Sequence, residues 1–437
     1  MFVIGNSLTN RMSKQSSPSI HGTTEHDSER NGTLSRRSFL ECMAWLGTGA
    51  VWVMQSGVLR SQTLDEALHG AKGSNDFTFV QISDSHIGFN KDANKDVIAT
   101  LRASLDKINT LPVQPDLLLH TGDLSHLAKA EQFDTLAQHL SGLRVKDQFF
   151  VPGEHDVAGD VDEFRTRYGK DTIGDGWYSF DHKGVHFIGL VNVMNLKAGG
   201  LGSLGHDQLE WLEKDVKGLT ASTPIVLFAH IPLWSVYPDW GWGTDDSAQA
   251  LSYLKRFGSV TVLNGHIHQI MQKVEGNVTF HTAMSTAFPQ PKPGTAPSPG
   301  PMKVSDEMLG TLLGITSIHR MTSHNEIAII DKPLVSATGM TDTQKDESNK
   351  QSAKEAANVI SIDNFKFTPA TLNMSVNTTV RWINKDDIPH KVAANDGSFK
   401  SPLLDTDQHF DYTPTKPGTY GYFCTLHAHM TGTLIVS

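Results

Sequence analysis

Two groups of residues in this chain have the types and spacing of metal ligands. The first group is dispersed, and each of its short motifs follows an apolar segment: Asp84-Ser85-His86, Gly122-Asp123, Gly153-Glu154-His155, His230 and Gly265-His266-Ile267-His268. Carboxylate oxygens and imidazole nitrogens suit hard and borderline cations. The group therefore predicts a site for two divalent or trivalent ions such as iron, manganese or zinc.

The second group is compact and lies near the C-terminal end: His390, Cys424, His427 and Met430. Two imidazoles and a thiolate, with a thioether as a weak further ligand, are typical of a copper centre that transfers electrons. The only other cysteine is Cys42, in a segment interpreted below as an export signal. In an oxidising compartment a lone thiol is a liability, and a bound copper ion would occupy it.

The first group needs elements that bring distant residues together. From residue 77 onward the pattern predicts strands over 77–83, 116–120, 148–151, 185–193, 224–230 and 260–264, alternating with helices over 97–108, 128–143, 206–219 and 247–257. Such alternation indicates a layered α/β fold. The candidate ligands follow the predicted strands, and in open α/β sheets the loops at these ends converge on one site.

Composition divides the chain further. Residues 1–62 are predicted to be a disordered N-terminal region with a targeting signal, and 76–332 the α/β domain. Residues 333–357, rich in Thr, Ser, Lys, Gln and Asp, indicate a linker, and 358–437 a short all-β domain. The proline-rich stretch 287–302 predicts a surface loop because proline cannot continue regular structure.

The ordered motifs of the first group resemble those of the calcineurin-like metallophosphoesterase superfamily. The resemblance implies a four-layer α/β sandwich and hydrolysis of phosphomonoesters or phosphodiesters by water activated between two metal ions. By position, Asp84, His86 and His268 would hold one ion and His230 and His266 the other. Asp123 would bridge the two ions, and His155 matches the histidine that gives a proton to the leaving oxygen.

Glu154 departs from the family pattern, which has asparagine as a ligand at this place. A third carboxylate lowers the net charge of the centre, and a trivalent ion such as Fe(III) would restore it. The other interpretation is that Glu154 serves as an ordinary oxygen ligand or points away.

The loop after His230 contains four aromatic residues: Trp234, Tyr237, Trp240 and Trp242. They either overhang the predicted site or pack against the rest of the protein and hold the loop in place.

Residues 358–437 resemble the cupredoxins, with the Cys-x-x-His-x-x-Met spacing of the amicyanin and plastocyanin group in Cys424, His427 and Met430. The segments Val380–Asn384 and Gly418–Cys424 belong to the match. The resemblance implies an all-β Greek-key sandwich with one type 1 blue copper ion, and an electron-transfer partner protein.

The N-terminal region resembles a twin-arginine signal. Arg36 and Arg37 directly precede an apolar run, Cys42 to Met54, that is short for a membrane span but suits a signal. Such signals export proteins already folded with their cofactors. We therefore expect a partner in the twin-arginine export machinery and a periplasmic or extracytoplasmic location, with membrane tethering if the signal stays uncleaved.

The net charge of −10 and the absence of a dense Lys/Arg run argue against nucleic-acid binding. The sequence thus predicts an exported phosphoric ester hydrolase acting on a small phosphoester, more specifically a phosphodiesterase, with an attached blue-copper electron-transfer domain. Regulation of the hydrolase by the redox state of this domain is one hypothesis; the other is that both sites are active but independent and are joined only for export. The alternative is a copper-binding electron-transfer protein that carries a vestigial phosphoesterase scaffold.

Overall fold

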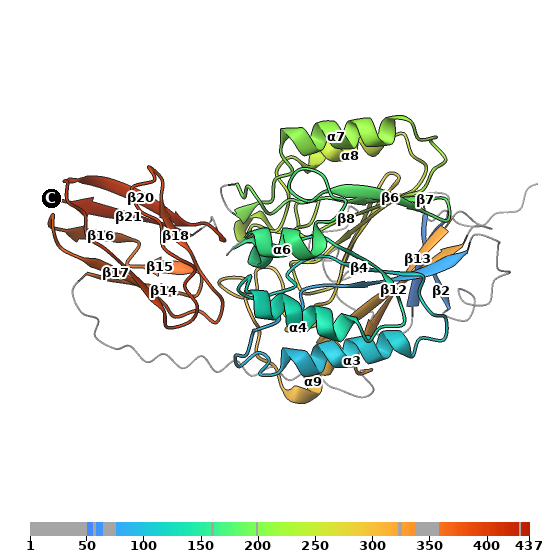
Figure 1. Ribbon diagram of the computed structural model, residues 1–437, viewed down its shortest axis with the longest axis horizontal. Coiled ribbons are helices and arrows are strands. Elements are labelled where there is room, and N and C mark those ends of the chain that lie inside the picture. Colours follow the sequence, from blue (N-terminus) through green and yellow to red (C-terminus); the bar gives the residue numbers. More distant parts are fainter. Residues whose placement is uncertain are drawn as a thin grey trace, which may run out of the picture. The chain divides into compact units, whose positions relative to one another are not determined.

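The computed structural model describes residues 50–55, 58–63, 76–158, 161–197, 200–321, 326–336, 358–427 and 430–437. Between residues 76 and 336, two sheets face each other, with helices on their outer faces (Figure 1). The predicted four-layer α/β sandwich is confirmed.

The first sheet has the strand order β2-β1-β13-β12-β3-β4-β5. Its strands are β1 Ala50–Gln55, β2 Val58–Thr63, β3 Phe77–Ile82, β4 Leu117–His120, β5 Asp147–Phe150, β12 Gly314–Met321 and β13 Glu326–Pro333. The helices on its outer side are α3 Val97–Asn109, α4 Ala130–Leu140 and α9 Asp306–Leu312 (Figure 1). Strands β3, β4 and β5 run parallel, so their carboxyl ends open at one edge.

The second sheet has the order β10-β11-β9-β8-β7-β6. Its strands are β6 Tyr178–His182, β7 Val185–Gly189, β8 Ile225–Ala229, β9 Val260–Asn264, β10 Met271–Glu275 and β11 Val278–Thr282. Helices α7 His206–Lys217 and α8 Ser247–Leu254 cover its outer face (Figure 1). The shorter helices are α5 Glu154–Val157, α6 Val161–Tyr168 and the 3-10 helix η2 Pro238–Trp240.

Aromatic side chains fill the space between the two sheets. Phe79 of β3 and Phe187 of β7 are fully buried, with ring centroids 5.3 Å apart. Phe228 of β8 belongs to the same cluster. Each such side chain contributes about 1.5–3 kcal/mol by leaving water. The core between the sheets holds the carboxyl ends of β3, β4, β8 and β9 in fixed relation, and the candidate ligands follow these ends.

The predicted elements are present, most of them with shorter ends; the strand predicted over 185–193 stops at Gly189. Helix α3 extends one residue beyond its prediction, and β5 begins one residue earlier than predicted. Strands β6 and β10 escaped prediction because they are edge strands with half-exposed residues and lack an apolar run. At the other end, the structure differs from the expectation that residues 1–62 lie outside the domain, because β1 and β2 form a hairpin whose Trp52 pairs with Ile329 of β13. A β-branched apolar segment suits an open sheet edge as well as a signal.

Residues 358–437 form two four-stranded sheets, ordered β15-β14-β17-β19 and β16-β21-β20-β18. The strands are β14 Val359–Asp363, β15 Lys366–Thr368, β16 Thr371–Met374, β17 Val380–Asn384, β18 Val392–Ala394, β19 His409–Tyr412, β20 Gly418–Cys424 and β21 Thr431–Val436. Alternation is clear in β17, where Val380 and Trp382 are buried and Arg381 is exposed. The expected all-β sandwich is confirmed. Among the described residues, no helix is both long and apolar enough to cross a membrane.

Candidate metal centres

The predicted ligands of the first site lie in loops or a helix start just after β3, β4, β5, β8 and β9. Several of them are non-glycine residues with positive φ: Asp84 at 54°, His86 at 40°, Asp123 at 52°, His266 at 71° and His268 at 53°. This left-handed conformation is uncommon outside glycine and costs free energy. The recurrence of this conformation just after the ends of β3, β4 and β9 indicates that the backbone is held in it to direct these side chains to one point.

Glycine is required beside two of these ligands. At Gly122, with φ of 98°, an added Cβ would overlap Nδ1 of His230. At Gly153, an added Cβ would overlap Oδ1 of Asp123. The glycines of the Gly-Asp and Gly-Glu-His motifs therefore allow three loops to approach more closely than any larger residue would permit.

One group of ligand atoms belongs to Asp84, His86 and His268. Nε2 of His268 lies 3.3 Å from Oδ1 of Asp84 and 3.3 Å from Nε2 of His86. Nδ1 of His268 donates to the carbonyl oxygen of Phe288 at 2.6 Å, which leaves a lone pair on Nε2. The three side chains converge as the sequence predicts.

A second group belongs to Glu154, His230 and His266. Oε1 of Glu154 lies 2.9 Å from Nδ1 of His266, and Oε2 lies 3.0 Å from Nε2 of His230. Nδ1 of His230 donates to the carbonyl oxygen of Thr121 at 2.7 Å, so Nε2 is the nitrogen that faces the carboxylate and would bind a metal ion once its proton is released. Glu154 therefore points into the site and not away from it.

Asp123 lies between the two groups. Its Oδ2 is 3.4 Å from Nε2 of His86 and 3.4 Å from Nε2 of His230. Buried atoms of the second group make no aligned hydrogen bond despite these short distances: Oε2 of Glu154, Nε2 of His230 and Nδ1 of His266. Buried polar atoms are nearly always paired, so this arrangement fits two cations that the protein's own ligands surround.

The electrostatics of the site match this interpretation. Burial opposes ionisation of Asp84 and Glu154, yet neighbouring histidines hold the pKa of Asp84 at about 2 and that of Glu154 well below its usual value. Burial also disfavours a charged His230, but Asp123 and Glu154 raise its pKa well above the ordinary value. A proton on His230 thus takes the place of a cation, and metal binding must release it.

Two further residues of the same loop differ in role. His155, buried, donates through Nδ1 to the carbonyl oxygen of His126 at 2.9 Å. Asp156 accepts hydrogen bonds from the backbone nitrogens of Gly153, Leu124 and Ser125 at 2.8–3.0 Å. Asp156 therefore ties the loop after β5 to the loop after β4, and its oxygens are used within the protein and not as ligands.

The aromatic loop after His230 packs inward. Trp240 and Trp242 are buried, and their ring centroids lie 5.0 Å apart with the planes at 82°. They form a cluster with Ile267, which stands between His266 and His268. Of the two interpretations, the structure favours packing. The two tryptophan rings contact Ile267 and thereby support the loop that carries His266 and His268.

Three of the four predicted copper ligands also converge. Sγ of Cys424 lies 3.5 Å from Nδ1 of His390 and 3.7 Å from Nδ1 of His427. The two Nδ1 atoms are 3.2 Å apart. Met430 is buried in the same apolar cluster as Cys424, and its backbone oxygen accepts from the Cys424 nitrogen at 3.0 Å. Three soft and borderline donors facing one point fit a copper ion.

One carboxylate supports this centre. Nε2 of His390 lies 2.8 Å from Oδ2 of Asp386. Burial disfavours the charged imidazole, but Asp386 and Cys424 raise the pKa of His390 to about 9. Burial likewise opposes the thiolate, while the hydrogen bond with His390 lowers the pKa of Cys424. The imidazole is therefore fixed with Nδ1 toward the thiolate.

Sequence reasoning missed several supporting groups. Asp386 carries a signal, because it lies four residues before His390. His126 also carries one, because it follows the Gly-Asp motif. The backbone oxygens of Thr121 and Phe288, which orient His230 and His268, carry none, since any residue type supplies a carbonyl.

Comparison with known proteins agrees with both centres. Residues 77–270 match the family model described as Calcineurin-like phosphoesterase, and residues 335–436 match the Cupredoxin-like domain. Both predicted resemblances are confirmed, as is the assignment to the phosphoric ester hydrolases.

Individual relatives match the phosphoesterase-like region and the cupredoxin-like region separately. A 3',5'-cyclic-nucleotide phosphodiesterase of Nostoc sp. is 28% identical over 217 residues, covering 48% of this chain and 79% of the relative. Amicyanin of Paracoccus denitrificans is 33% identical over 87 residues, covering 19% of this chain and 66% of the relative. A protein named as a probable glycerophosphodiester phosphodiesterase of Arcobacter nitrofigilis is 27% identical over 166 residues, covering 35% of this chain and 56% of the relative.

Proposed function

Because the chain contains a calcineurin-like phosphoesterase domain followed by a cupredoxin-like domain, we propose that it is a binuclear-metal phosphodiesterase with an attached electron-transfer domain. The observation that carries the proposal is the place of Asp123, whose Oδ2 is equidistant from one imidazole of each ligand group. Asp84, His86 and His268 would hold one ion, and Glu154, His230 and His266 the other.

When bound, two such ions supply Lewis acidity toward phosphoryl oxygens and lower the pKa of a water molecule. The protein's own residues provide the rest. His230 and His268 are oriented by backbone carbonyl oxygens before any ligand arrives, so little rearrangement accompanies binding. His155 keeps its Nδ1 proton on the His126 carbonyl oxygen, and its Nε2 is the atom that gives a proton to the leaving oxygen.

The substrate class is a phosphodiester. The cyclic-nucleotide and glycerophosphodiester phosphodiesterase names of two relatives support this choice over a monoester. The direct test is the ratio of rates on bis(p-nitrophenyl) phosphate and p-nitrophenyl phosphate, with Asp123→Asn as the variant. The diester should react faster and the variant should lose nearly all activity; preference for the monoester would contradict the diester assignment. A wild type inactive on both esters would favour the vestigial-scaffold alternative.

Glu154 bears on the identity of the ions. Its two oxygens face both His230 and His266, so the site contains three carboxylates with Asp84 and Asp123. Three negative charges favour one trivalent ion, and Fe(III) is the common biological choice. Active, natively produced protein that holds two divalent ions and no iron would contradict this part of the proposal.

The cupredoxin-like domain would bind one copper ion through His390, Cys424, His427 and Met430 and exchange electrons with a partner protein. An iron ion in the first site gives this domain a target for regulation, because the oxidation state of iron changes the charge of the centre. Ascorbate and ferricyanide should then alter phosphodiesterase activity, and Cys424→Ser should remove the response. An equal response in the variant would exclude regulation by copper.

Export remains a proposal based on sequence. The twin-arginine segment, with Arg36 and Arg37, lies outside the described residues. The proposed location is periplasmic or extracytoplasmic, after export in the folded state. Lysine at both positions should retain the protein in the cytoplasm of its host, as cell fractionation would detect, whereas unchanged distribution would contradict the signal.

A further inference from the structure

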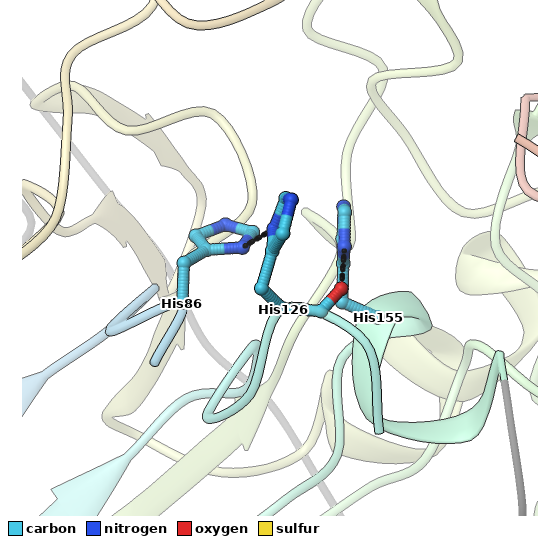
Figure 2. A group of neighbouring side chains, drawn as sticks. All are labelled: His86, His126 and His155. Atoms are coloured by element: carbon cyan, nitrogen blue, oxygen red, sulfur yellow. Dashed lines mark hydrogen bonds between the residues drawn. The ribbon is translucent and has the colours of Figure 1, made fainter. Parts of the chain in front are cut away.

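We propose that His126 is a positioning residue that connects the metal ligand His86 to the proton donor His155. Figure 2 shows its imidazole facing that of His86, while its backbone oxygen receives the Nδ1 of His155. The inference rests on the proposed function, since it assigns a role within the same site. Neither the ligand set nor the proton donor predicted from the sequence includes His126.

The side-chain contact has a defined direction. Nε2 of His86 faces Asp123 and His268, at 3.4 and 3.3 Å, so this nitrogen is the metal-facing atom and must keep its lone pair. The proton of a neutral His86 is then on Nδ1, which lies 3.4 Å from Nδ1 of His126. His86 donates this contact, and Nδ1 of His126 must accept it.

The tautomer of His126 follows from that direction. With the lone pair on Nδ1, a neutral imidazole carries its proton on Nε2. That Nε2 is buried and has no hydrogen-bond partner among the described residues. A buried donor without a partner is destabilising, because it has lost its hydrogen bonds to water and gained none in the protein. The fold therefore retains a stability cost at His126, which a residue kept only for packing would not impose.

The surroundings hold the imidazole in place. The loops that carry His86 and His126 pair through their backbones, with the His126 nitrogen donating to the oxygen of Ile87 at 3.0 Å. Phe89 packs edge-on against His126, with ring centroids 5.3 Å apart. These apolar and backbone contacts exclude water from the contact between the two imidazoles, which strengthens it.

The backbone half of the connection is independent of the side chain. The carbonyl oxygen of His126 accepts from His155, and the two rings stack with centroids 5.1 Å apart and planes at 18°. A substitution at 126 keeps that carbonyl oxygen. The side-chain role at His86 is thus separable from the orientation of His155, and the two can be measured apart.

The test compares His126→Asn with His126→Leu in the full chain. Asparagine places an acceptor oxygen near the position of Nδ1, whereas leucine removes the acceptor at similar volume. Groups that orient a metal ligand are worth about 10–100-fold in metal affinity. Zn(II) affinity, measured by competition with a chelating dye, should fall by that factor in His126→Leu and stay close to the wild type in His126→Asn.

Stability completes the design. Leucine at position 126 removes one unpaired buried donor, Nε2 of His126, but leaves another, Nδ1 of His86, without its acceptor. The metal-free His126→Leu protein should therefore unfold at a denaturant concentration similar to that of the wild type. His319→Leu, which removes a half-buried imidazole from β12 away from the ligands, serves as the control and should leave Zn(II) affinity unchanged.

A spectroscopic readout is independent of hydrolysis. In Zn(II)-loaded protein labelled with ¹⁵N-histidine, nitrogen–proton correlations should show His86 protonated at Nδ1 and His126 protonated at Nε2. Any one of three results would overturn the inference. They are a His126 protonated at Nδ1, an unchanged Zn(II) affinity in His126→Leu, and a third Zn(II) ion that is lost only in His126→Leu. A wild type that shows the predicted tautomers and Zn(II) affinities but hydrolyses no ester would contradict the proposed function and leave the positioning role intact.

Discussion

Oδ2 of Asp386 lies 2.8 Å from Nε2 of His390, on the opposite edge of the imidazole from the Nδ1 that faces Cys424. The same carboxylate accepts from the backbone nitrogen of Phe365 at 3.0 Å. Asp386 thus fixes the ring and also increases electron density on its metal-facing nitrogen, which favours Cu(II) over Cu(I).

Asp386→Asn should therefore raise the reduction potential of the copper-loaded protein. If the loss of affinity is about tenfold greater for Cu(II) than for Cu(I), the rise is about 59 mV for this one-electron couple. Cyclic voltammetry measures it directly. Asp387→Asn removes an exposed neighbouring carboxylate and should leave the potential nearly unchanged; equal shifts in both variants would indicate a general charge effect.

Glu154→Gln should weaken metal binding selectively at the group with His230 and His266. The amide keeps the size of the side chain but loses the charge that faces both imidazoles, and we expect about 10–100-fold lower affinity for one of two ions. Metal analysis after dialysis should find about one ion retained. Glu131→Gln, at an exposed helix position, is the matched control, and two ions retained in Glu154→Gln would show that the carboxylate is not a ligand.

Asp156→Ala should destabilise the phosphoesterase domain without removing a ligand. It leaves the buried backbone nitrogens of Gly153, Leu124 and Ser125 without an acceptor, and the expected loss is about 3 kcal/mol or more. Urea unfolding of metal-free protein checks the magnitude. A loss below about 1 kcal/mol, the range of an ordinary surface change, would mean that the two loops are held together by other contacts.

His319 predicts a pH dependence of stability that is independent of the metal sites. Burial lowers the pKa of His319 from 6.5 to about 4, and its ring nitrogens pair with the hydroxyl groups of Thr78 and Ser317 at 3.0 Å. Between these pH values the unfolded chain binds more protons than the folded one. Stability is therefore full above about pH 6.5 and falls as the pH decreases toward 4, by about 2 kcal/mol at pH 5.

The check is the difference in unfolding free energy between pH 7.5 and pH 5, which should be about 2 kcal/mol smaller in His319→Gln than in the wild type. The control is His206→Gln, whose imidazole is 79% exposed and should not alter the difference. The same pH dependence in the wild type and in His319→Gln would contradict the assignment.

The sequence predicted the main secondary-structure elements and the metal ligands, but it did not predict the groups that orient those ligands. Strands buried on both faces, such as β8 and β9, are continuous apolar runs and were identified, whereas the half-exposed β6 and β10 were not. The orientation of Glu154 required the structure, because only the convergence of three loops shows that its oxygens face His230 and His266. The tautomer of His126 depends on a contact between two loops and has no local sequence signal.

The strand β1 illustrates the remaining ambiguity. Residues 50–54 are apolar and β-branched or aromatic in part, a composition shared by the end of an export signal and by an edge strand. Pairing with β13, which is distant in sequence, places residues 50–55 at the sheet edge, and periodicity contains no information about that partner.

The central claim is that two metal ions in the phosphoesterase domain act together, with Asp123 between them. The most direct measurement is the rate of bis(p-nitrophenyl) phosphate hydrolysis as metal-free protein is titrated with Mn(II), with bound metal counted at each point. We predict that the rate saturates at two ions per domain in the wild type and stays low at any content in Asp123→Asn. A rate that saturates with one ion, or one that is unaffected in Asp123→Asn, would contradict the account.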